Sequence, residues 1–451
     1  MLTALEAVLP AAAVVGGTDR LAAYRSDEAR WVQAGMPAAA VLPRTTDEVS
    51  AALRVASELG VPVVPRGAGT GLSGGAAAID GCIVLCTARM DSIEHVDADD
   101  QLAVVQAGVV TADLDAAAAR VGLWYPPDPS SWRECTVGGN IATNAGGLCC
   151  VRYGTTSAYV LGLEVVLADG SVLRTGGRTV KGVAGYDVTR LMVGSEGTLG
   201  VVTRATVRLR RRRRVPGTVV AFFPDLVAAG AAVIDVLAAP LATTLLEIMD
   251  RTTIAAVDDL TRMGLDRDAA ALLVAQVEDP GDVAVVEAVF TSAGATSVHA
   301  SSDEAEADLL LEARRLSLPA LQRRGTVLLD DVAVPRTALP RLITAVERAA
   351  ADIGLTIGTF GHAGDGNLHP TIVYDAGDPG SCDAALAAFD TIVGAALELG
   401  GTITGEHGVG VLKAGWLERE VGATALRVQR SLKAALDPRG LLNPGKVLLS
   451  D

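Results

Sequence analysis

Three of the chain's five histidines lie between residues 362 and 407. His362 and His369 flank Asp365-Gly366, a dipeptide that favours a tight β-hairpin, and strand-like residues stand on either side. A two-residue loop would set the two imidazoles directly opposite one another on one face, with Cβ atoms about 5 Å apart. That spacing suits two ligands of one metal ion, whereas a longer loop would break this register.

A carboxylate and the third histidine follow at Glu406 and His407. In an extended chain adjacent residues point to opposite sides, so one can bind a metal while the other faces elsewhere. His362, His369 and Glu406 would form a two-histidine, one-carboxylate site for zinc, manganese or iron, and His407 would remain as an acid or base. Alternatively, these histidines cap turns or satisfy buried hydrogen bonds. The same ligands also suit a metallohydrolase or a non-haem iron enzyme, so they do not name the reaction.

Three glycine-rich segments indicate backbone lying against a ligand: residues 65–75, 126–147 and 194–200. The first contains the pattern GxGxxG, but a Rossmann fold requires a helix directly after that loop, and residues 79–87 look like a turn and a strand. Its backbone N–H groups, with Arg66 and nearby hydroxyls, can still bind a phosphate. Three separated loops of small residues argue for one long ligand that crosses several segments.

The elements that must position these residues change character near residue 215. Before it, short β and α units alternate, including a helix for which Thr45-Thr46-Asp47-Glu48 offers an N-cap and early acids and which Gly60 would close. From Val215 to Ile353 glycine is sparse, and strand-like pieces at 218–223 and 271–277 alternate with helices rich in Ala, Leu and Glu. This pattern predicts a separate α+β domain with an antiparallel sheet.

Composition excludes several classes of protein. The 451 residues carry a formal net charge of -15, which argues against general nucleic-acid binding. No uninterrupted apolar stretch reaches about 18 residues, so we expect no transmembrane helix. The N-terminus has Glu6 and no basic segment, so a cytoplasmic location is expected, with peripheral contact at the inner face of the membrane left open. The six cysteines show no metal spacing and are expected to be reduced.

One basic run stands out in this acidic chain: Arg208 followed by Arg210–Arg214. It can be a solvated strand end or an interdomain linker. It can also be a docking patch for an anionic surface or an acidic partner.

The motifs together resemble a group of FAD-binding, vanillyl-alcohol-oxidase (VAO)-type flavoproteins that contains the glycolate oxidase catalytic subunit and the D-lactate and D-2-hydroxyglutarate dehydrogenases. The matching segments span nearly the whole chain in family order: PRGAGTGLSGG at 65–75, PPDPSSWRECTVGGNIATNAGG at 126–147, RYGTT at 152–156, LGLEVVLADG at 161–170, KGVAGYDVTRLMVGSEGTLGVVT at 181–203, HAGDGNLH at 362–369, GEHGVG at 405–410 and LDPRGLLNPGK at 436–446.

The resemblance implies an α+β fold with a bipartite FAD-binding domain of the PCMH/VAO type and a ferredoxin-like cap domain with an antiparallel sheet. Residues 1–214 would bind FAD, residues 215–404 would form the substrate and cap domain with the metal site, and residues 405–451 would return to the FAD domain. The implied cofactor-binding residues are Arg66, Gly67, Gly69, Thr70, Gly71, Ser73, Gly74, Asp128, Ser130, Thr136, Gly138, Gly139, Asn140, Thr143, Asn144, Gly146, Glu196, Gly200, Val202 and Asn443. Because the 65–75 loop has no histidine, where some relatives attach flavin covalently, we expect non-covalent FAD.

The implied reaction is oxidation of a D-2-hydroxy acid to the 2-oxo acid. His362, His369 and Glu406 would hold the divalent metal, which lowers the pKa of the substrate hydroxyl. His407 would take the proton as the substrate hydride passes to flavin N5. Arg314 would bind the substrate carboxylate, with Arg315 as an adjacent rival, and both can also be exposed helix charges.

Departures from the family pattern reduce the range of expected substrates. Leu329 stands where the hydroxyglutarate branch has a lysine, so a second cation for a distal carboxylate is missing, and we expect lactate or glycolate. Cys149-Cys150 stands where relatives often have an arginine and an aliphatic residue, and no function is assigned to this difference. A transferase of the ether-lipid type would need a run of consecutive histidines that this chain lacks. A catalytic subunit that works only within a complex stays open. The electron acceptor also stays open: a quinone, a cytochrome, an electron-transfer flavoprotein or oxygen, with oxygen the least favoured by the resemblance.

Overall fold

The computed structural model describes residues 1–212, 216–301 and 303–449, and the chain divides into two compact units. Unit 1 comprises Met1–Gly146, Thr155–Arg212 and Glu406–Asp451, and unit 2 comprises Gly147–Gly154 and Arg213–Gly405. The chain thus leaves unit 1 and returns to it after residue 405. The short segment Gly147–Gly154 belongs to unit 2, although the sequence placed it in the first domain.

Unit 1 begins with a four-stranded sheet in the order β1-β2-β4-β3. Its strands are β1 (Val14–Val15), β2 (Ala39–Val41), β3 (Val63–Arg66) and β4 (Ile83–Cys86). Helix α3 (Thr46–Leu59) lies in the same hydrophobic core. Thr45 accepts a hydrogen bond from the Glu48 N–H and Gly60 is left-handed, so both predicted helix ends are confirmed. The glycine-rich loop after β3 leads into β4, which runs parallel to β3, so the rejection of a Rossmann motif is confirmed.

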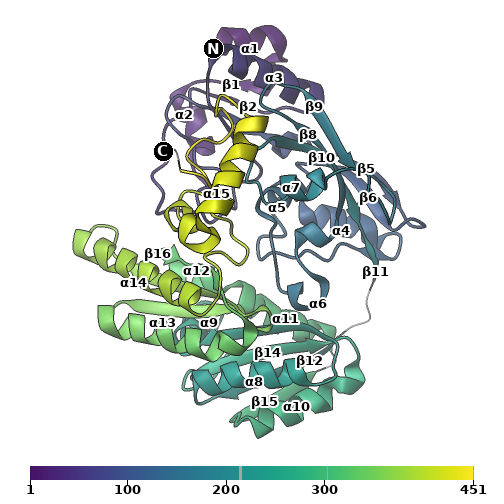
Figure 1. Ribbon diagram of the computed structural model, residues 1–451. Coiled ribbons are helices and arrows are strands. Elements are labelled where there is room, and N and C mark those ends of the chain that lie inside the picture. The colour runs from purple at the N-terminus through teal and green to yellow at the C-terminus, as the bar shows by residue number, and fades with distance from the viewer. Residues whose placement is uncertain (213–215, 302, 450–451) are drawn as a thin grey trace. The chain divides into compact units, whose positions relative to one another are not determined.

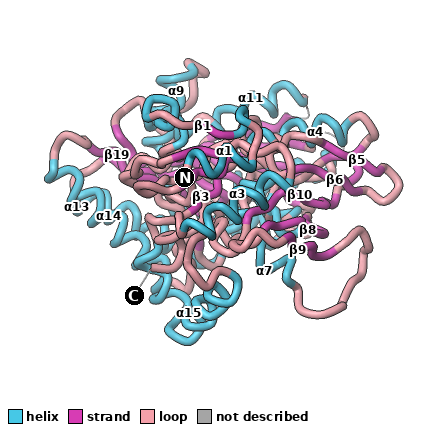
Figure 2. Tube along the Cα trace, turned by 90° about the horizontal axis from the view of Figure 1, so that it is seen from above, coloured by secondary structure: helices cyan, strands magenta, loops and turns pink. Residues whose placement is uncertain are grey.

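The second sheet of unit 1 is antiparallel and has the order β5-β6-β10-β8-β9 (Figure 1). Its strands are β5 (Ile93–Asp97), β6 (Leu102–Gln106), β8 (Val160–Val166), β9 (Val172–Gly176) and β10 (Val201–Arg208). A long exposed loop, residues 177–187, joins β9 to α7 (Val188–Met192) (Figure 2). The other helices of unit 1 are α1 (Leu2–Val8), α2 (Thr18–Leu21), α4 (Thr111–Ala119), α5 (Val137–Thr143) and α15 (Leu417–Leu436).

The first residues of the run Arg210–Arg214 form a short strand. Arg210–Arg211 forms the exposed strand β11, which pairs with β7 (Leu123–Trp124). The N–H of Arg212 donates to the carbonyl oxygen of Gly122 at 3.0 Å, whereas Arg213 and Arg214 lie outside the described residues.

Unit 2 is built on one antiparallel sheet in the order β15-β12-β14-β13-β18-β19-β16, with β17 also on β19. Its strands are β12 (Gly217–Phe223), β13 (Thr243–Asp250), β14 (Ala271–Val277), β15 (Ser297–Ser301), β16 (Thr326–Leu329), β17 (Val332–Ala333), β18 (Thr356–His362) and β19 (Asn367–Tyr374). The order β15-β12-β14-β13 is the 4-1-3-2 order of a ferredoxin-like unit, as the resemblance implied.

Helices bury the central strands of unit 2. Every residue of β12, β13 and β14 is buried, and β12 and β14 read as nearly continuous apolar runs. The helices are α6 (Cys150–Tyr153), α8 (Leu226–Ala238), α9 (Arg251–Thr261), α10 (Val283–Ser292), α11 (Glu304–Arg315), α12 (Ser317–Gln322), α13 (Leu339–Ile353) and α14 (Pro379–Glu398). Burying a polar side chain inside such a strand costs free energy unless the side chain has a hydrogen-bond or ion-pair partner. The few polar side chains in these strands therefore indicate specific interactions.

Among the described residues, only α14 is long and apolar enough by length and composition to cross a membrane. It packs against α13 and β19 through Phe389, Ile392 and Val393, among others. A single helix of this kind is weak evidence for a membrane span.

Candidate active site

The hairpin of β18 and β19 carries His362 and His369. The loop between the strands covers residues 363–366, so His362 pairs with Asn367 and His369 pairs with Phe360. The predicted two-residue loop, with His362 directly opposite His369, is therefore wrong. The register differs by two residues, and because side chains alternate with a period of two, both histidines still share one face.

The two imidazoles are close neighbours on that face. Their ring centroids lie 5.2 Å apart with an interplanar angle of 85°. Both side chains are buried, and one ring nitrogen of each lies within 4.8 Å of the other. This spacing is close to that of two ligands of one metal ion, whose nitrogens lie at most about 4.2 Å apart when each is 2.0–2.1 Å from the metal.

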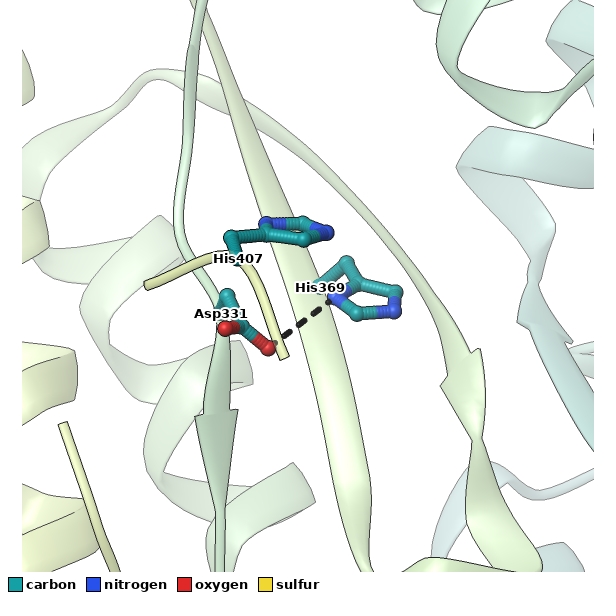
Figure 3. Close-up of side chains that lie close together, drawn as sticks. All are labelled: Asp331, His369 and His407. Atoms are coloured by element: carbon teal, nitrogen blue, oxygen red, sulfur yellow. Dashed lines mark ion pairs between the residues drawn. The ribbon is translucent and has the colours of Figure 1, made fainter. Parts of the chain in front are cut away.

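Each histidine has a buried carboxylate on its Nδ1 side. His362 Nδ1 lies 2.7 Å from Oε1 of Glu247, and His369 Nδ1 lies 3.5 Å from Oδ1 of Asp331, an ion pair drawn in Figure 3. Metal-binding histidines commonly direct their second ring nitrogen to a carboxylate. Nε2 of each ring is therefore the nitrogen suited to a metal.

Sequence reasoning missed both carboxylates as partners of the histidines. Glu247 comes from β13, which pairs with β18 through Ile248 and Gly361. One step along that register places Glu247 opposite His362. A Glu between the apolar neighbours Leu246 and Ile248 of a buried strand was the signal that could have found it. Asp331, between β16 and β17, accepts hydrogen bonds from the Asn367 amide and the Thr404 hydroxyl, both at 2.8 Å.

Arg314 belongs to this buried network in unit 2. It lies near the end of α11, only 1% exposed, and its Nε is 2.8 Å from Oε2 of Glu247. Its guanidinium carbon lies 4.8 Å from the centre of the Phe360 ring. The alternative that Arg314 is an exposed helix charge is therefore wrong. Arg315, the adjacent rival, is partly buried.

Glu406 and His407 stand at the start of the final segment of unit 1. The chain bends there, and His407 Nε2 lies 3.7 Å from Oε1 of Glu406. The expectation that these neighbours point to opposite sides is wrong, because it assumed an extended backbone. A Cβ on Gly146 would collide with the Glu406 carboxylate, so glycine at 146 permits this close approach.

A polar cluster in unit 1 holds the backbone that follows His407. The Ser73 hydroxyl donates to the carbonyl oxygens of His407 and Gly408, at 3.2 and 2.8 Å. The Glu196 carboxylate accepts from the N–H groups of Val409 and Gly410, at 2.7 and 2.9 Å. Burial raises the pKa of Glu196 to about 7, although these two hydrogen bonds act to lower it.

Asn443 ties the same cluster to the glycine-rich segments. Its side-chain amide donates to the carbonyl oxygens of Gly75 and Glu196, at 2.8 and 2.7 Å. Its Oδ1 is buried, and no described residue donates to it. A buried acceptor without a donor is costly, so a cofactor group that donates a hydrogen bond fits this position.

Several of the expected cofactor-binding residues have partners within the protein. Arg66 donates to the carbonyl oxygen of Ser26 at 2.7 Å, and a side chain on Gly69, which has positive φ, would collide with it. Asn140 donates to the Thr111 hydroxyl at 2.9 Å. Gly200 lies so close to Val165 that any Cβ would require movement. These four expected cofactor-binding positions therefore also help to hold the conformation of the loops.

The remaining expected residues lie on the same loops. Thr136 caps α5 by accepting from the Gly139 N–H, and Gly138 packs closely on Ala107. Asn144 is left-handed and its Oδ1 accepts from the Ser157 N–H. Partly buried or exposed positions on these loops and on β10 are Gly67, Thr70, Gly71, Asp128, Ser130, Thr143 and Val202, and Gly74 is buried with positive φ.

The fold and the matches to two family domains define a flavoprotein. The chain belongs to the FAD-linked oxidase family: residues 37–176 match the FAD binding domain and residues 212–447 match the FAD linked oxidases, C-terminal domain. The chain is 45% identical over 422 residues to glycolate oxidase subunit GlcD of Bacillus subtilis, covering 92% of this chain and 90% of that protein. It is 37% identical over 431 residues to D-lactate dehydrogenase of Archaeoglobus fulgidus, covering 94% and 95%.

Solved structures confirm the fold. The 4-ethylphenol oxidase of Gulosibacter chungangensis matches with a TM-score of 0.81 at 19% identity, covering 99% of this chain and 96% of that one. The predicted FAD-binding fold with mixed helices and antiparallel sheets is thus confirmed, as are the oxidoreductase class and the use of FAD.

Proposed function

We propose that the chain is an FAD-dependent dehydrogenase that oxidises a D-2-hydroxy acid, with D-lactate or glycolate favoured, to the 2-oxo acid. The observation that carries the proposal is the buried pair His362 and His369, each with a carboxylate on its Nδ1 side, in an FAD-linked oxidase chain. The names of two relatives, a glycolate oxidase subunit and a D-lactate dehydrogenase, support this class of substrate.

His362, His369 and Glu406 would hold a divalent metal, either zinc, manganese or iron. Two observations within the units support this set: the two ring nitrogens lie within 4.8 Å, and Thr404 is anchored to Asp331 at 2.8 Å. Glu406 follows Thr404 by two residues, so its Cα lies within about 7 Å of the Thr404 Cα. The metal, when bound, lowers the pKa of the substrate hydroxyl.

His407 would accept the hydroxyl proton at a ring nitrogen. The hydrogen bonds from Ser73 to the carbonyl oxygens of His407 and Gly408 fix the backbone that carries this ring. Arg314 would bind the substrate carboxylate, and its five N–H groups allow a bound carboxylate as well as the ion pair with Glu247. FAD, when bound, supplies the electron sink that accepts the substrate hydride.

Flavin is expected to be released completely when the protein is denatured. The 65–75 loop has no histidine, so nothing there offers the usual imidazole for a covalent bond. Heat-denatured protein passed through a filter should leave the yellow colour in the filtrate. Colour retained with the polypeptide would contradict non-covalent binding.

Anaerobic mixing with single substrates tests the proposed reaction. Flavin absorbance near 450 nm is expected to bleach with D-lactate or glycolate, more slowly with L-lactate, and at least about tenfold more slowly with D-2-hydroxyglutarate. Leu329 is the reason for the last expectation, because an apolar side chain cannot pair with a distal carboxylate. Comparable rates with D-2-hydroxyglutarate would overturn the choice of a monocarboxylate, and no bleaching with any acid would overturn the proposed substrate class.

A second candidate is a catalytic subunit that needs partner chains, since a 45% identical relative is named as a subunit. The exposed strand Arg210–Arg211 is the candidate docking site for an acidic partner or an anionic membrane surface at the cytoplasmic face. Turnover of the purified chain with a dye acceptor separates the two candidates. The physiological acceptor would be a quinone, a cytochrome or an electron-transfer flavoprotein.

A further inference from the structure

A buried chain of three side chains leads away from the candidate metal position. His362 Nδ1 lies 2.7 Å from Glu247 Oε1, and Glu247 Oε2 lies 2.8 Å from Arg314 Nε. All three side chains are at most 5% exposed. Burying an arginine and a glutamate is costly, and an ion pair alone often does no better than apolar packing. The contact between Glu247 and the third member, His362, suggests a functional role for this buried ion pair.

We propose that Glu247 is a positioning residue that fixes the tautomer and the ring orientation of His362 for metal binding, with Arg314 orienting Glu247. This inference rests on the proposed metal site. A carboxylate only accepts hydrogen bonds, so Nδ1 of His362 must carry the proton that faces Glu247. A neutral ring then presents the lone pair of Nε2, which is the form that binds a metal.

The location of the three residues supports a positioning role. Glu247 lies on β13, beside His362 on β18, so two rigid hydrogen-bonded strands set the spacing between carboxylate and imidazole. Arg314 comes from α11, and its Nε forms an ion pair with the other carboxylate oxygen at 2.8 Å. His369 has a looser arrangement, since its Nδ1 is 3.5 Å from Asp331. Glu247 is therefore the stronger of the two supports and the one to test.

Glu247→Gln is a sharp test because the amide keeps the shape but not the symmetry of the carboxylate. Arg314 can only donate, so the amide oxygen is expected to turn toward Arg314 and the amide NH2 toward His362. Nδ1 must then accept, and the proton moves to Nε2, where it blocks metal binding. Zinc affinity should fall about 10- to 100-fold, as for other partners of metal-binding histidines.

The experiment is a zinc titration, without substrate, of metal-stripped protein that retains FAD, in competition with a chromophoric chelator. Glu164→Gln is the matched control, because Glu164 is a buried carboxylate that pairs with Arg174 at 2.9 Å in unit 1. The double variant Glu247→Gln/Arg314→Met should recover part of the affinity, because the amide oxygen is then able to face His362.

Each outcome has a distinct meaning. No zinc binding by the unsubstituted protein would overturn the proposed metal site. Zinc bound equally by Glu247→Gln and by the protein without substitutions would leave that site intact and overturn the role of Glu247. No recovery in the double variant would overturn the role of Arg314.

A measurement on the unsubstituted protein does not depend on how any variant folds. The chain has five histidines, so two-bond ¹H–¹⁵N spectra of histidine-labelled, metal-free protein are simple enough to assign with single variants. His362 is expected to carry its proton on Nδ1. A proton on Nε2 would overturn the inference.

Discussion

His407→Ala is expected to slow flavin reduction by D-lactate or glycolate about 10²- to 10⁴-fold, the usual contribution of a positioned general base. The ring lost is the one that would take the hydroxyl proton, whereas the FAD-binding loops keep their contacts. Anaerobic stopped-flow mixing, with the bleaching rate measured at saturating substrate, gives the effect directly. Free imidazole added to the variant should restore part of the rate.

The matched control is His95→Ala, which removes an exposed histidine in β5 whose Nε2 lies 3.3 Å from the carboxylate of Asp97. It should reduce flavin at the normal rate. Zinc content should stay normal in His407→Ala, because the proposed ligands are intact. A His407→Ala rate within threefold of normal would reject His407 as the base.

His369→Gln is expected to lose the bound metal and to slow substrate oxidation about 10³-fold or more. A metal ion stabilises developing negative charge on oxygen by several kcal/mol, and each 1.4 kcal/mol corresponds to about tenfold in rate. Glutamine keeps much of the volume of the buried ring, which limits the cavity that alanine would leave. The measurements are metal content by elemental analysis and the rate of flavin bleaching.

Chelation provides an independent route to the same result. Protein without substitutions should lose activity in EDTA and regain it with added zinc or manganese, whereas His369→Gln should regain none. His299→Gln, at an exposed position of β15, should behave normally throughout. Full activity in metal-stripped protein would exclude a metal-assisted reaction, while leaving the flavoprotein family unaffected.

Local chemistry allowed the sequence to predict much of the fold. Thr45 and Gly60 bound a helix because a hydroxyl cap and a left-handed glycine act within one turn of chain. Long motifs in family order identified the FAD-linked oxidase class, because such segments rarely recur by chance. That His362 and His369 share a face also followed, since the face depends only on whether the register is odd or even.

The sequence was wrong where the result depended on the geometry of a turn. Asp365-Gly366 favours a two-residue loop, but the loop of four residues shifted the pairing of His362 from His369 to Asn367. The bend at residues 405–407 likewise replaced the extended chain that would have separated Glu406 from His407. Both depend on backbone dihedrals that distant packing selects.

By itself, the sequence determined the class of protein, the glycine-rich loops and the two histidines of the hairpin. Only the tertiary structure decided which charged side chains surround them. Glu247, Arg314 and Asp331 come from β13, α11 and the turn before β17, segments that are far apart along the chain. They meet because the order of strands places β13 beside β18, and because a buried charge is stable only next to its partner.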